Sequence, residues 1–199
     1  MLRIRPLVLV LLLAVLSGCL SVTPRGLVEM AGFDPLQMNP AELGAGLGVP
    51  DSIRLVDGDA MIAMSYQVRG EPAPRVNEMF LLELSDSTEV AGTPLPVEGE
   101  RIFVGRLSRL DAIRMKDVQA RILRYKAEGL AGQGSFSVSL RGGCTTAPLL
   151  TRLPFRTFVK TRPDAAYVET TRRADFLASL PRSQREVFLA EFRTCSQPG

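Results

Sequence analysis

The stretch SRLDAIRMKDVQARILRYKAEG, residues 108–129, lies between two segments that have the residue pattern of β-strands. Ser108 and Asp111 have the spacing of a helix-capping box, and Gly129 is typical of the residue that ends a helix. Apolar side chains recur at helical spacing and predict one buried face: Leu107, Met115, Val118, Ile122 and Tyr125. The stretch therefore predicts one amphipathic helix that packs on a sheet.

Strand patterns surround this helix along the chain. The segment GSFSVSLR, residues 134–141, alternates strictly, so that Phe136, Val138 and Leu140 share one face and three serines share the other. Further strands are predicted at 53–56, 60–68, 79–84, 101–107, 155–161 and 167–170, and C-terminal helices at 174–180 and 183–193. These elements predict a single α+β domain with a mainly antiparallel β-sheet, packed by the central helix and the C-terminal helices.

Three local signals refine this prediction. Asn39 followed by Pro40 predicts a brief helix over 39–47, although glycines at 44 and 46 weaken it. The pair at 57–58, Asp followed by Gly, predicts a β-hairpin that joins the strands at 53–56 and 60–68. Ser183 and Glu186 predict a capping box for the last helix.

The N-terminal region has the character of an export signal. Arg3 and Arg5 precede ten consecutive Ala, Val or Leu residues at 7–16, a run too short for a membrane span of about 20 residues. The run ends at Leu16, which together with Ser17, Gly18 and Cys19 resembles the lipobox of bacterial lipoproteins.

The resemblance to bacterial lipoproteins implies the organisation of the chain. Residues 1–18 would be a signal peptide, a diacylglyceryl group of palmitate-type chains would be attached to Cys19, residues 19–38 would be a tether, and residues 39–199 would form a periplasmic domain. Leu20 stands where aspartate would indicate retention at the inner membrane, so the resemblance implies anchoring in the cell outer membrane, facing the periplasm. The inner membrane is the less favoured alternative.

The order of elements is also similar to that of uncharacterised proteobacterial envelope lipoproteins. That similarity implies no particular activity.

Net charge does not favour a nucleic-acid partner. The chain has 24 basic and 21 acidic residues, and removal of residues 1–18 takes away Arg3 and Arg5, which leaves 22 basic against 21 acidic. Nucleic-acid binding would require a basic patch or stripe on the mature domain.

The two remaining cysteines predict a disulfide. With Cys19 acylated, Cys144 and Cys195 form an even pair in an oxidising compartment. The alternative is a pair of free thiols at a metal or catalytic site, which would have no histidine partner because the chain contains no histidine.

Catalysis has no recognisable constellation in this sequence. The absence of histidine excludes the usual triads and histidine-containing metal sites. None of the three lysines follows a serine at the Ser-x-x-Lys spacing, and no glycine-rich segment joins a strand to a helix as a phosphate-binding loop does. We therefore expect a non-enzymatic protein with no metal and no cofactor other than the covalent lipid on Cys19.

The outer face of the central helix is the predicted contact surface, with Arg109, Lys116 and Arg124 beside Ile113 and Leu123. Basic residues beside exposed apolar ones on a tethered domain can contact anionic lipid or a partner, whereas an ordinary solvated helix face is the alternative. The first functional hypothesis is an interaction or structural component of the envelope that binds an envelope protein. The second is a small-ligand or glycan binding module that makes contact through the long loop at 85–99.

Overall fold

The computed structural model describes residues 33–86 and 92–195 and confirms the α+β class. Seven strands form one sheet, in which each pair of neighbours is antiparallel, in the order β6-β3-β4-β5-β1-β8-β9. Their bounds are β1 (Gly44–Pro50), β3 (Ala60–Val68), β4 (Val76–Asp86), β5 (Glu100–Leu107), β6 (Gly132–Leu140), β8 (Pro154–Lys160) and β9 (Val168–Asp175).

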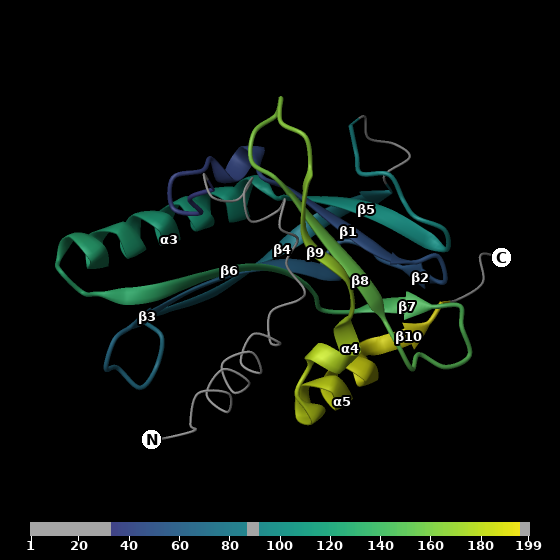
Figure 1. Ribbon diagram of the computed structural model, residues 1–199. Helices are drawn as coiled ribbons and strands as arrows, with labels where there is room; N and C mark the ends of the chain where they lie inside the picture. Colours follow the sequence, from purple (N-terminus) through teal and green to yellow (C-terminus); the bar gives the residue numbers. More distant parts are fainter. Residues whose placement is uncertain (1–32, 87–91, 196–199) are drawn as a thin grey trace, which may run out of the picture.

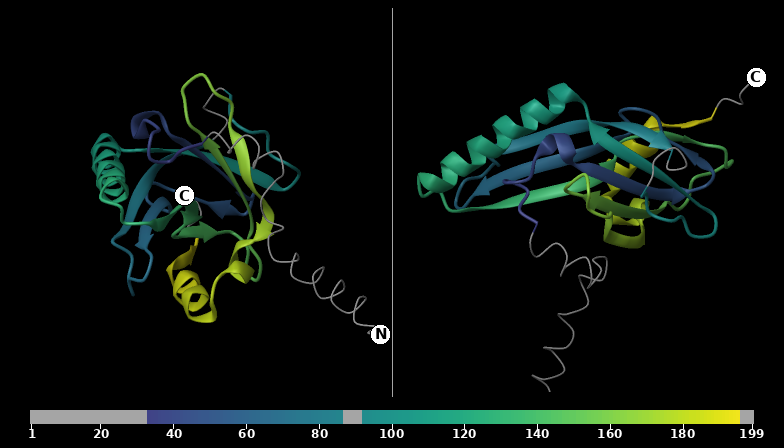
Figure 2. Two further views of the ribbon diagram at one scale, coloured as in Figure 1. Left: turned by 60° about the vertical axis from the view of Figure 1, so that its left-hand side comes forward. Right: turned by 90° about the horizontal axis from the view of Figure 1, so that it is seen from above.

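A second, three-stranded sheet has the order β10-β7-β2, formed by β10 (Phe192–Thr194), β7 (Gly143–Thr145) and β2 (Ile53–Arg54). The helical elements are η2 (Pro40–Glu42), α3 (Arg109–Ala127), α4 (Phe176–Ser179) and α5 (Arg182–Glu191). The large sheet curls around the core, with α3 on one side and the C-terminal helices α4 and α5 on another (Figures 1 and 2).

The core lies inside the curl of the large sheet. Side chains from β1, β3, β4 and α3 meet there and are at most 2% exposed, among them Leu47, Ile62, Tyr66, Phe80 and Met115. Tyr66 donates its hydroxyl hydrogen to the Leu130 carbonyl at 2.7 Å, so its polar end is satisfied.

The central helix forms as predicted. The Ser108 hydroxyl accepts a hydrogen bond from the Asp111 amide at 3.0 Å, and Gly129 follows the helix with a φ of +77°. Met115, Val118 and Ile122 are buried, and Tyr125 packs at the edge of the core. The predicted apolar face is therefore the face that packs on the sheet.

The predicted helix over 39–47 is wrong. Only Pro40–Glu42 forms a helical turn, capped by the Asn39 side chain, and β1 follows at once. Alternation explains the outcome, because Ala45, Leu47 and Val49 face the core while glycines occupy the alternate positions 44, 46 and 48. At Gly48 a Cβ would lie 2.5 Å from Oε1 of Glu100, so that position accepts only glycine without a shift.

The predicted hairpin at 57–58 is also wrong, although the chain does turn there. β2 pairs with β7, whereas β3 pairs with β4 and β6. The turn is held by β4 instead, since the Leu84 amide donates to the Asp57 carboxylate at 2.6 Å and the Gly58 amide donates to the Leu82 carbonyl at 3.0 Å. The two strands therefore diverge into separate sheets.

The C-terminal helices differ from prediction at their ends. α5 begins at Arg182, and Glu186 pairs with Arg182 at 3.1 Å instead of completing a capping box with Ser183. The residues after Glu191 form β10, which runs parallel to β7, so the last helix is shorter than predicted. Cys144 of β7 and Cys195 after β10 form the predicted disulfide.

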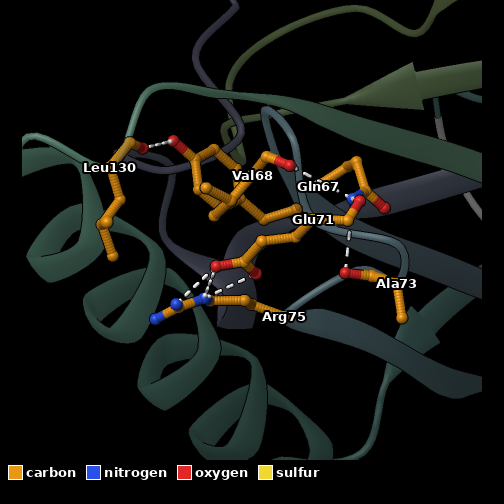
Figure 3. Close-up of polar contacts among 7 residues, drawn as sticks. Gln67, Val68, Glu71, Ala73, Arg75 and Leu130 are labelled. Atoms are coloured by element: carbon orange, nitrogen blue, oxygen red, sulfur yellow. Dashed lines mark hydrogen bonds and ion pairs between the residues drawn. The ribbon is translucent and has the colours of Figure 1, made fainter.

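The loop between β3 and β4 is ordered by side chains at its two ends (Figure 3). Gln67 donates from Nε2 to the carbonyls of Val68, Glu71 and Ala73 at 2.7–3.3 Å. Arg75 donates Nε to both carboxylate oxygens of Glu71 at 2.8–2.9 Å. That hydrogen bond lowers the pKa of Glu71 below its ordinary value.

Asp175 stabilises the junction between β9 and α4. Its Oδ1 accepts hydrogen bonds from the amides of Leu153 at 3.0 Å and Leu177 at 3.1 Å. Burial alone would raise the pKa of Asp175, but these bonds, a further backbone bond from Ala178 and the nearby Arg152 guanidinium lower it below the ordinary value.

We expect Asp175→Ala to lower the free energy of unfolding at pH 7 by about 1–2 kcal/mol, as loss of a helix cap does. Because the folded pKa is lowered, the stabilisation is present above the unfolded pKa of about 3.9 and is lost as the pH falls through the folded pKa. Urea unfolding of both proteins between pH 3 and pH 7 measures the difference. Asp164→Ala is the control, since that carboxylate is 79% exposed. If the difference in free energy of unfolding between Asp175→Ala and wild type does not shrink below pH 4, the expectation is contradicted.

Candidate binding cleft

A cleft of about 720 Å³ lies between α3, η2 and the end of β5. Its lining comes from segments far apart in the sequence: Asn39, Pro40, Ala41, Glu83, Arg106, Leu107, Arg109, Ala112, Ile113 and Lys116. A second hollow of about 360 Å³ adjoins it, because Asn39, Pro40 and Lys116 line both, and this second hollow also includes Leu123. We call the two hollows together the α3 cleft.

The short segment before β1 forms one wall of the α3 cleft. Asn39 caps η2 by accepting a hydrogen bond from the Ala41 amide at 3.2 Å, and its own amide group donates to Glu42 at 2.8 Å. Gln119 of α3, which is only 4% exposed, donates from Nε2 to the carbonyls of Pro35 at 2.8 Å and Met38 at 3.1 Å. A buried amide thus ties this wall to the helix.

Residues 33–38, part of the predicted tether, pack on the domain. The rings of Phe33 and Phe136 meet edge to face at 5.4 Å, and Leu36 and Met38 contact the core. The packed part of the chain therefore begins before residue 39.

The charges of the cleft are mainly positive. Arg106, Arg109 and Lys116 line it, and the only acidic lining residue is Glu83, which lies 3.4 Å from Arg106 in an exposed pair. Arg109 and Lys116 form no ion pair within residues 33–86 and 92–195. By contrast, Arg114 and Arg121 of the same helix pair with Asp111 and Glu78 at 2.7 and 2.8 Å.

Apolar side chains lie beside these cations. Ile113 is 54% exposed and Leu123 is 43% exposed, although each is large and aliphatic. The arrangement can therefore hold an anionic group by charge and an apolar group by contact.

The structure brings most of the predicted surface together. Arg109, Ile113 and Lys116 line the larger hollow, and Leu123 lines the smaller one with Lys116. Arg124 is exposed on the same helix but does not line either hollow. Sequence reasoning missed Arg106, Glu83 and Asn39 as cleft residues, because only the sheet register and the fold of η2 bring them to α3.

The other predicted features have different outcomes. Cys19 and the proposed lipobox lie outside the described residues, as does the segment 87–91 of the loop at 85–99. The described end of that loop is held near Glu100, whose carboxylate accepts from the Val97 amide at 3.0 Å. In the described part of the chain no three His, Cys, Asp or Glu side chains are grouped as metal ligands would be.

Among the described residues, no helix has the length and apolar character needed to cross a membrane. Comparisons with protein-family models, curated proteins and solved structures find no match to this chain.

Proposed function

We propose that this protein is a lipid-anchored, periplasm-facing lipoprotein of the outer membrane that acts as a non-enzymatic interaction component of the cell envelope. In this proposal, the α3 cleft binds an acidic segment of an envelope protein. The observation that carries the proposal is a pair of cations, Arg109 and Lys116, that have no ion-pair partner among the described residues and lie in a cleft that also exposes Ile113.

Charge complementarity favours an acidic occupant. Three cations and one carboxylate line the larger hollow, so an occupant with carboxylates would gain charge-assisted hydrogen bonds. Such complementarity mainly raises the association rate and the specificity of binding. Ile113 and Leu107 would contact apolar side chains spaced between those carboxylates.

The concave shape favours a protein segment over the bilayer surface. A planar membrane would contact the exposed ridge of α3 but would not enter the hollow between α3 and η2. An extended segment can fill the larger hollow and continue into the smaller one, since the two adjoin at Lys116.

Anchoring would keep the cleft near the membrane. Phe33, where the described structure begins, lies 14 positions after Cys19, since 33 minus 19 is 14. At 3.3–3.6 Å per residue this length spans at most about 50 Å. Two or more acyl chains anchor a protein stably, whereas one binds only reversibly.

We expect Cys19→Ala to abolish incorporation of labelled palmitate and to release the domain from the membrane fraction. The thiol is the group that the lipid modification requires, so no other residue replaces it. Labelling of wild type and variant in cells, followed by fractionation, measures both effects. Unchanged labelling of the variant would refute the anchor but would leave the α3 cleft to be tested separately.

The cleft is tested by photo-crosslinking from position 113 in living cells, with position 149 as the control. Leu149 is 74% exposed and lies outside the α3 cleft. The proposal predicts a crosslink from 113 to an acidic peptide of one envelope protein. The double substitution R109E/K116E should lower its yield by at least about tenfold, which corresponds to about 1.4 kcal/mol.

Two results would overturn the assignment of the cleft. Crosslinks from 113 to lipid alone would assign the surface to the membrane, and a yield unaffected by R109E/K116E would exclude a role for these charges. As a stability control, the double variant should unfold at the same urea concentration as wild type, because both side chains are exposed.

A further inference from the structure

A third hollow is lined by residues of α4, α5, the start of β3 and the end of β6. Figure 1 shows these C-terminal helices on the other side of the large sheet from η2. The volume of this hollow is about 690 Å³, within the range of small-molecule sites. We call it the C-terminal crevice. Its lining includes the apolar residues Met61, Leu140, Phe176, Leu180, Val187 and Phe188.

The floor of the C-terminal crevice is aromatic and aliphatic. The rings of Phe176 and Phe188 meet edge to face at 5.1 Å, and Leu140 at the end of β6 is buried. Val187 of α5 lines the crevice and is nevertheless 66% exposed. An apolar chain that entered the crevice would cover Val187 and lie against the two rings.

The rim of the crevice carries two cations without ion-pair partners. Arg141 follows β6 and Arg193 lies in β10, and neither forms an ion pair within the described residues. Of the two acidic lining residues, Asp59 is already engaged, because its Oδ2 accepts a hydrogen bond from the Val56 amide at 2.8 Å. Glu191 is the other. The crevice lining therefore holds two guanidinium groups and two carboxylates, and among the described residues Arg141, Arg193 and Glu191 are in no ion pair.

We propose that the C-terminal crevice binds the acyl chain of a single-chain anionic amphiphile. The chain lies against Phe176 and Phe188, and the carboxylate or phosphate headgroup accepts hydrogen bonds from Arg141 and Arg193. Guanidinium groups suit this role because their planar donors match both anions. This site does not depend on the function proposed for the α3 cleft.

The test is calorimetric titration of the full chain carrying Cys19→Ala, so that acyl groups on Cys19 cannot compete. The probes are dodecanoate, dodecyl phosphate and lysophosphatidylglycerol, each below its micelle concentration, and neutral dodecanol below its solubility limit. We expect saturable one-to-one binding of the anions and binding of dodecanol that is weaker by about tenfold or more, since each tenfold step is about 1.4 kcal/mol. Tighter binding of lysophosphatidylglycerol than of dodecanoate would indicate a phospholipid as the source, and the reverse order a free fatty acid.

Substitutions locate the site. V187D places a charge where the chain enters and should weaken every probe by about tenfold or more, whereas L149D, a charge at an equally exposed apolar position elsewhere, should change nothing. R141Q/R193Q should reduce the affinity for the anions to that for dodecanol and leave dodecanol unchanged. R69Q is the matched control, since it removes another exposed arginine that forms no ion pair with the described part of the chain.

Three results would overturn the proposal: no saturable binding of any anion, binding unaffected by V187D, or equal losses in V187D and L149D. Circular dichroism of each variant shows whether it is folded, and because Val187 and Leu149 are exposed we expect all spectra to match wild type.

Discussion

Arg156→Met is expected to lower the free energy of unfolding by about 3–5 kcal/mol, because it removes one partner of a buried ion pair. Nη1 of Arg156 lies 2.7 Å from Oε2 of Glu100, whose side chain is only 2% exposed, and Nε lies 3.1 Å from Oε1 of Glu169. Without the guanidinium, Glu100 keeps one amide donor among the described residues, from Val97, and no ion-pair partner among them. In a protein of this size the loss corresponds to a fall in Tm of about 10 °C, which urea unfolding and thermal circular dichroism both measure.

Two controls separate the buried pair from a general effect of arginine removal. Arg106→Met breaks the pair with Glu83, in which the arginine side chain is 80% exposed, and should cost at most about 1 kcal/mol. Adding Glu100→Gln to Arg156→Met should recover part of the stability, since it removes the uncompensated charge. A loss below about 1 kcal/mol in Arg156→Met would show that Glu100 is solvated in the native state.

Removal of the disulfide by the double substitution C144S/C195S is expected to cost about 4 kcal/mol, within a range of about 2–5 kcal/mol. The two cysteines are 51 positions apart, and a crosslink over a loop of that length restricts the unfolded chain strongly. Urea unfolding with and without a reducing agent measures the effect. The reductant should destabilise wild type and leave C144S/C195S unchanged, and an equal response of both proteins would contradict the expectation.

When the disulfide is removed, we expect the C-terminal helices to open locally more often than the rest of the domain. α4 buries Leu177 and α5 buries Phe188, so these helices have few core contacts of their own, while the disulfide fixes the end of β10 to β7. Hydrogen exchange should therefore show the largest loss of protection in residues 176–194 and little change in α3, since local opening follows the number of buried contacts.

The central helix and the strands around it could be predicted because each carries its own local signal. Ser108 and Gly129 mark the two ends of α3, and the alternation of Phe136, Val138 and Leu140 identifies β6. The disulfide followed from counting cysteines. For α3 and β6, the residues that decide the structure are close in sequence. For the disulfide, only two cysteines remain once Cys19 is set aside, so each has one possible partner.

The errors occurred where distant contacts decided the outcome. Asn39 is a helix cap, but alternating glycines follow it at 44, 46 and 48, so the segment had signals for both a helix and a strand. Pairing with β5 on one side and β8 on the other made residues 44–50 the strand β1. The turn at 57–58 looked like a hairpin, but bonds to Leu82 and Leu84 of β4 directed the two strands into different sheets.

Sequence by itself therefore determined the α+β class and the disulfide. It also determined the span of α3, its buried face and the outward position of its basic face. Each of these features depends on local periodicity or on a pair of residues. Only the tertiary structure decided the order of strands, the ion pair between Arg156 and Glu100, the α3 cleft and the C-terminal crevice. The physical reason is that a cleft is formed by the surfaces of several elements. In the α3 cleft, Arg106 of β5 and Asn39 before η2 lie in one lining with Lys116 of α3. This arrangement depends on the curl of the sheet and on the hydrogen bonds from Gln119 to the carbonyls of Pro35 and Met38.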